Sequence, residues 1–105
     1  MASELRFEVE TPLGFSVRVS PSYWQFIVTV KHPTMAGMET EVQATLRQPE
    51  EIRRSRSDAN VYLFYREQFI QRWFCAVARR LNGEGFLITT YPTDAIKAGE
   101  IIWRR

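Results

Sequence analysis

Apolar and polar residues alternate with a period of two along most of the chain, and the longest such stretch covers residues 61–93. It holds three segments rich in β-branched and aromatic residues, at residues 61–66, 72–80 and 86–91. Residues 82–85, Asn-Gly-Glu-Gly, are typical of the tight turn that joins two antiparallel strands. This stretch therefore predicts a central antiparallel sheet.

Both faces of the predicted sheet carry apolar residues. Successive side chains of a strand point to opposite faces, so Leu63 and Tyr65 share one face while Tyr62 and Phe64 share the other. Arginines and tyrosines are concentrated toward the strand ends. The pattern is typical of a sheet that is covered on one side and partly covered on the other.

Two further extended segments are predicted before this sheet. Residues 5–20 alternate strictly around a Thr-Pro-Leu-Gly turn, which predicts an amphipathic β-hairpin. Residues 23–30 form an apolar run that we interpret as another strand. His32 precedes Pro33, and a residue in that position favours extended backbone, so we expect His32 to close this strand.

After residue 33 the period of the apolar pattern changes from two to about 3.6 residues, the period of an α-helix. One apolar stripe has spacings of three, four and four, and it consists of Met35, Met38, Val42 and Leu46. We expect a helix over residues 34–48, capped by Thr34 and ended by Pro49. Its stripe would pack on the central sheet.

The remaining segments are short. Residues 50–57 are mostly charged and predict an edge strand. Pro92 is expected to stop the last long strand, residues 95–98 to form a turn of helix, and residues 100–103 to form a strand or a packed tail. The whole pattern predicts an α+β fold with a single main helix packed on an antiparallel β-sheet and an extra N-terminal β-hairpin.

Composition agrees with one domain over residues 1–105, with residues 1–22 as the hairpin extension. Of its 105 residues 45% are hydrophobic, which is enough for a core without disulfides, and Cys75 is the single cysteine. We expect Cys75 to be buried in the core. We find no signal-peptide pattern and no membrane span, so we expect a cytoplasmic protein.

Charge is unevenly distributed although the net charge is only +2. Residues 52–82 hold seven basic and two acidic residues, a local excess of +5, and of the fourteen basic residues of the chain all but Lys31 and Lys97 are arginine. Guanidinium groups bind phosphate oxygens in a bidentate manner and stack on nucleobases. A basic surface that only maintains solubility is the simpler alternative.

Few residues are suited to chemistry. The chain has one histidine and one cysteine and lacks carboxylates at metal-ligand spacing, so we expect no metal and no cofactor. His32 is the one side chain whose ordinary pKa lies near neutrality. A histidine combined with arginines and hydroxyl groups suits metal-free RNA cleavage, in which a base takes the 2′-hydroxyl proton and cations stabilise the phosphorane.

The order of these motifs resembles a known superfamily. The motifs are Lys31-His32-Pro33, the amphipathic helix, Pro49-Glu50-Glu51-Ile52-Arg53-Arg54-Ser55, Tyr65-Arg66, a long strand with Val77 and Arg79, and Ile88-Thr89-Thr90-Tyr91-Pro92-Thr93. Together they resemble the small phage- and toxin-associated nuclease domains of the barnase, EndoU, colicin and RelE superfamily. The resemblance covers about residues 24–93 and leaves out the N-terminal hairpin. Thr90 stands where that superfamily usually has a smaller residue.

The resemblance implies a metal-independent endoribonuclease of toxin or mobile-element type. Its implied catalytic residues are His32, Arg54, Tyr65 and Thr90. Its implied substrate-binding residues are Arg53, Arg56, Arg79, Tyr91 and Thr93. RNA would be the substrate, and an antitoxin or immunity protein would be a partner. Two alternatives stay open, a non-catalytic module of the same fold that binds RNA or protein, and an arginine-rich interface for a partner or a second copy.

Overall fold

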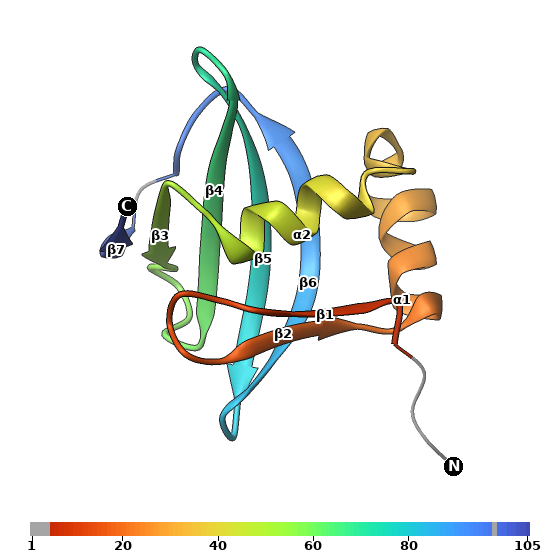
Figure 1. Ribbon diagram of the computed structural model, residues 1–105, viewed down its shortest axis with the longest axis horizontal. Helices are drawn as coiled ribbons and strands as arrows, with labels where there is room; N and C mark the ends of the chain where they lie inside the picture. Colours follow the sequence, from red (N-terminus) through yellow and green to blue (C-terminus); the bar gives the residue numbers. More distant parts are fainter. Residues whose placement is uncertain (1–4, 98) are drawn as a thin grey trace.

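Seven strands form one sheet in the computed structural model, which describes residues 5–97 and 99–105 (Figure 1). The strand order is β1-β2-β6-β5-β4-β3-β7, and neighbouring strands are antiparallel except for β2 and β6, which are parallel. The strands are β1 (Phe7–Glu10), β2 (Ser16–Val19), β3 (Glu51–Arg54), β4 (Val61–Phe69), β5 (Arg72–Leu81), β6 (Glu84–Thr93) and β7 (Glu100–Arg104). The predicted α+β class, central sheet and N-terminal hairpin are confirmed.

The segment predicted as a strand over residues 23–30 is helical, so that prediction is wrong. Helix α1 (Pro21–Phe26) continues directly into a π-helical turn, η1 (Ile27–Lys31). Ser20 caps its start, because its hydroxyl accepts a 3.2 Å hydrogen bond from the backbone N–H of Tyr23. A serine cap followed by proline is a helix start signal. Among the described residues, none of the helices is long and apolar enough to cross a bilayer.

The main helix is shorter than predicted. A 3₁₀ turn, η2 (Pro33–Met35), precedes it, and helix α2 spans Glu39–Arg47. Gly37 lies between them with φ +80°, which stops a continuous helix, so Thr34 does not cap α2. The predicted stripe is confirmed, because Met35, Val42 and Leu46 are buried and Met38 packs against the same core.

Three predictions at the sheet margins are also wrong. Strand β3 is not an edge, because β7 pairs with its outer side. Strand β6 continues through Pro92 to Thr93. Strand β2 pairs with it only near its start, at Gly85 and Phe86, so the later part of β6 is an edge in the described sheet. An edge strand tolerates a proline. Residues 95–97 form no helical turn, and Ala98 lies outside the described residues.

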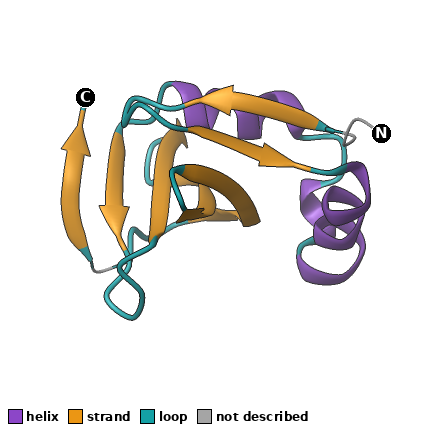
Figure 2. Ribbon diagram, turned by 90° about the horizontal axis from the view of Figure 1, so that it is seen from below, coloured by secondary structure: helices purple, strands orange, loops and turns teal. Residues whose placement is uncertain are grey.

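The long strands have two unlike faces. Helix α2 and the β1–β2 hairpin cross the face that we call the helix face, which contributes Tyr62, Phe64 and Phe74 to the main core (Figure 1). The opposite face, which we call the open face, has a smaller cluster centred on Tyr65 and Cys75. Figure 2 shows the curvature of the sheet. The prediction of one covered and one partly covered face is therefore confirmed, and so is the burial of Cys75.

Candidate functional site

A cavity of about 420 Å³ lies on the open face, and we call it the trough. Its walls come from the loop after β3, from β4, β5 and β6, and from the segment before β7. The lining residues are Ser55, Arg56, Ser57, Val61, Leu63, Val77, Thr89, Tyr91 and Lys97. The hydroxyl oxygens of Thr89 and Tyr91 are buried and have no hydrogen-bond partner among the described residues. Buried polar atoms are normally satisfied, and the Tyr91 hydroxyl lies next to the Cys75 thiol.

His32 lies against the rim of the trough. The turn η1 ends there with a 2.7 Å hydrogen bond from the His32 backbone N–H to the Ile27 carbonyl oxygen. Its ring packs on Tyr91 with centroids 5.2 Å apart. Partial burial, followed by the positive charge of Lys31, lowers the pKa of His32 below its ordinary value of 6.5. The imidazole is therefore neutral at neutral pH and can accept a proton.

Tyr91 and Lys97 form the part of the trough next to His32. The ammonium nitrogen of Lys97 lies 5.4 Å from the centroid of the Tyr91 ring. Burial, together with the neighbouring Cys75 thiol, raises the pKa of Tyr91 well above its usual range. Tyr91 thus keeps its proton, while Lys97 supplies a positive charge over its ring.

Tyr65 lies beneath this region rather than in it. Its side chain is fully buried, and its hydroxyl accepts a 3.1 Å hydrogen bond from the backbone N–H of Lys97. Burial raises the pKa of Tyr65 strongly, and burial also raises the pKa of Cys75 to about 11. The hydroxyl of Tyr65 therefore fixes the segment that carries Lys97, and we leave Tyr65 out of the proposed site.

The four candidate arginines are separated by the structure. Arg56 is exposed and lines the trough. Arg53 is on the same face but pairs with Glu51 and donates a 3.3 Å hydrogen bond to the Lys97 carbonyl. Arg79 forms a 2.8 Å ion pair with Asp58.

Arg54 points to the helix face. It pairs across the strands with Tyr62, and its guanidinium carbon lies 5.6 Å from the centroid of that ring. One of its nitrogens is 3.8 Å from a carboxylate oxygen of Glu100. Arg54 is thus on the opposite side of the sheet from Tyr91 and does not join the trough.

The two candidate threonines also lie elsewhere. Thr90 is fully buried opposite Ala76, a residue of the helix-face core, and donates a 2.8 Å hydrogen bond to the Cys75 carbonyl. Thr93 donates a 2.9 Å hydrogen bond to the Ala95 carbonyl within a local turn. The structure places Arg56 and Tyr91 in the trough with Thr89 and Lys97, which the sequence analysis did not select, and His32 packs on Tyr91. Alternation along β6 places Thr89, not Thr90, beside Tyr91.

Comparison with known proteins identifies no relative. No protein-family model matches the chain, and no curated protein or solved structure matches it significantly.

Proposed function

We propose that this protein is a metal-independent endoribonuclease of toxin or mobile-element type. The observation that carries the proposal is the position of the chain's one histidine, which packs against Tyr91 at the rim of a trough that also holds Lys97 and Arg56. Metal-free RNA cleavage requires a base and positive charge to stabilise the phosphorane, and the neutral His32 and two cations meet these needs. A cytoplasmic location and an antitoxin or immunity protein as partner belong to the same proposal.

The proposed reaction is an internal transfer at phosphorus. His32 takes the proton of the ribose 2′-hydroxyl, and the 2′-oxygen attacks the adjacent phosphorus. The bond to the 5′-oxygen breaks, and that oxygen takes a proton from the ammonium group of Lys97. Arg56 stabilises the negative charge of the phosphorane, and the Tyr91 ring packs against His32. The products are a 2′,3′-cyclic phosphate and a 5′-hydroxyl.

The direct test compares nucleic acids in the presence of EDTA. Purified protein should cut a single-stranded RNA and leave DNA of the same sequence intact, because DNA lacks the 2′-hydroxyl. Cleavage that needs added magnesium, or equal cleavage of DNA, contradicts the mechanism. Binding of RNA without any cleavage supports instead the non-catalytic binding module, since the cations of the trough attract phosphate in either case.

The pH dependence of cleavage follows from His32. Its pKa is lowered in the folded protein, so the neutral form needed for a base is populated from below pH 6.5 upward. We expect kcat/KM to rise with pH along an acid limb whose midpoint is below 6.5 and then to level off. The measurement is a pH–rate profile, with binding of an uncleavable 2′-O-methyl RNA over the same range as control. A midpoint well above 6.5 excludes His32 as the base.

Arg56 on the open face and Arg54 on the helix face allow a matched comparison of two variants in RNA binding. Arg56→Ala should weaken binding of a short single-stranded RNA. It should also reduce the slope of log Kd against log salt concentration by about one, the value expected for the loss of one phosphate contact. Arg54→Ala removes the same charge from the helix face and should leave affinity close to that of the wild type. The measurement is fluorescence anisotropy at several salt concentrations. Equal effects of both variants mean that RNA does not select the open face.

A further inference from the structure

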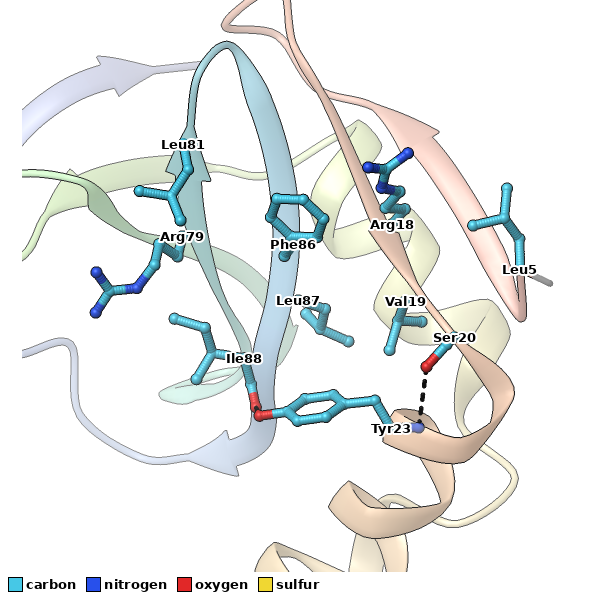
Figure 3. Close-up of a pocket in the computed structure, with 10 residues that line it drawn as sticks. All are labelled: Leu5, Arg18, Val19, Ser20, Tyr23, Arg79, Leu81, Phe86, Leu87 and Ile88. Atoms are coloured by element: carbon cyan, nitrogen blue, oxygen red, sulfur yellow. Dashed lines mark hydrogen bonds between the residues drawn. The ribbon is translucent and has the colours of Figure 1, made fainter. Parts of the chain in front are cut away.

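A second and larger cavity, of about 560 Å³, lies between β2, the start of α1 and β6 (Figure 3). Its walls are mainly apolar and include Val19, Tyr23, Phe86 and Ile88. The few polar groups on its walls are engaged locally. The hydroxyl of Tyr23 donates a 2.8 Å hydrogen bond to the Ile88 carbonyl, and Ser20 caps α1. The cavity therefore offers apolar and aromatic surface rather than free hydrogen-bonding groups.

This cavity adjoins the trough on the open face. Arg79 lines the cavity, and Val77, two residues earlier on β5, lines the trough. Residues two apart on a strand point to the same face, so both side chains lie on the open face. On β6 the step from Phe86 to Thr89 is roughly 10 Å, at about 3.3 Å per residue. A strand with one nucleotide in the trough could therefore place its next nucleotide at Phe86.

His32 lines neither cavity but is connected to both through its neighbours. Its neighbour Lys31 donates a 3.2 Å hydrogen bond to the carbonyl of Ile88, a residue of the larger cavity. The His32 ring itself packs on Tyr91, a residue of the trough. A phosphate beside His32 would thus have the trough on one side and the larger cavity on the other.

An aromatic ring and a cation mark the rim of the larger cavity. The guanidinium carbon of Arg18 lies 4.9 Å from the centroid of the Phe86 ring, and Arg18 also forms a 2.6 Å ion pair with Glu84. This pair is partly exposed and therefore weak, so Arg18 can exchange the carboxylate for a phosphate. The guanidinium of Arg79 points away from the cavity in Figure 3, consistent with its ion pair to Asp58.

We propose that the larger cavity is a base pocket, which binds one nucleobase of a single-stranded RNA next to the scissile phosphate. The base would stack on Phe86, and Arg18 would contact the adjoining phosphate. The described residues that line the pocket offer no free group to read a base edge, so it accepts any base and favours purines for their larger stacking area. Its place next to the scissile phosphate rests on the proposed ribonuclease function.

The experiment measures binding of a 2′-O-methyl hexa-adenylate, which cannot be cleaved, and of a hexamer with the same backbone whose sugars are abasic. Stacking contributes about 1–3 kcal/mol per base, so the adenine in the pocket should raise the affinity of the wild type by about 5- to 150-fold. Phe86→Ala should remove most of that gain and leave abasic affinity unchanged. Phe86→Tyr, which keeps a ring, and Phe69→Ala, which removes an exposed ring at the end of β4, should behave like the wild type.

Each outcome decides the proposal separately from the nuclease activity. Equal binding of both hexamers, or a full base-dependent gain in Phe86→Ala, overturns the base pocket and leaves the cavity to an apolar side chain of a protein partner. A Phe86-dependent gain in a protein that cuts no RNA keeps the pocket and rejects the nuclease. If a thermal melt shows that Phe86→Ala is unfolded, a hexamer that carries the fluorescent base 2-aminopurine tests the stacking instead. Its fluorescence should be quenched by wild-type protein and less by Phe86→Leu, and equal quenching contradicts the pocket.

Discussion

His32→Ala should lower kcat/KM for RNA cleavage by about 10²- to 10⁴-fold, the usual effect of removing a general acid–base group. In the proposed mechanism the imidazole is the base, and its lowered pKa leaves it neutral and able to accept the 2′-hydroxyl proton. The measurement is single-turnover cleavage of a labelled RNA at pH 7.5 in EDTA.

Two controls separate chemistry from folding in this experiment. His32→Ala should bind uncleavable RNA like the wild type and should unfold at a similar temperature, because His32 is only partly buried. Thr29→Ala changes an exposed residue of the same helical segment, whose hydroxyl donates a 2.7 Å hydrogen bond to the Gln25 carbonyl, and should retain activity. Full activity in His32→Ala would reject the base assignment and transfer the role to another group of the trough, without rejecting the nuclease.

Leu46→Ala should lower the free energy of unfolding by about 2–5 kcal/mol. Leu46 is fully buried in α2 and belongs to the stripe that packs on the helix face of the sheet. Removing its side chain loses the transfer free energy of the buried carbons and leaves a cavity in the core. Urea unfolding followed by circular dichroism measures the change.

The matched control for Leu46 is Glu41→Ala, one turn or so earlier on the same helix. Glu41 forms a 3.6 Å ion pair with Arg66, and both side chains are substantially exposed. Exposed pairs contribute about 0–1 kcal/mol, so this variant should be close to the wild type. Equal destabilisation by the two variants would mean that α2 presents a different face to the sheet.

The strands were predictable wherever side chains alternate strictly. Phe7, Val9, Val17 and Val19 are all buried on one face of the hairpin, and this alternation is visible in the sequence itself. Residues 23–30 were misread because a short apolar run fits a strand or a buried helix equally well. Trp24, Ile27 and Val28 are buried while Phe26 and Val30 are exposed, which is a helical spacing, and the start signal at Ser20 and Pro21 favours the same reading.

The candidate site was only partly predictable, since adjacent residues of a strand cannot both face one cavity. Arg53 and Arg54 lie on opposite faces, as do Thr90 and Tyr91. Because neighbouring side chains of a strand point to opposite faces, the sequence alone could have excluded one residue of each pair from the site. The packing of His32 on Tyr91 joins residues 59 positions apart, and no local pattern indicates it.

Lys97 was missed for a similar reason. It comes from a segment that looked like a short helix, and it is fixed in place through a hydrogen bond from its backbone to Tyr65. That hydrogen bond joins the segment before β7 to the middle of β4. Only the complete sheet, with β7 added beside β3, brings the two together.

The most direct test of the proposed chemistry uses a DNA oligonucleotide that contains a single ribonucleotide. In EDTA, the protein should cut this strand once, on the 3′ side of the ribose, and mass spectrometry should find a 2′,3′-cyclic phosphate on one product and a 5′-hydroxyl on the other. The same strand with a 2′-O-methyl group at that sugar should stay intact. Cleavage at deoxyribose linkages, cleavage of the methylated strand, or products with a 5′-phosphate would contradict attack by the 2′-oxygen.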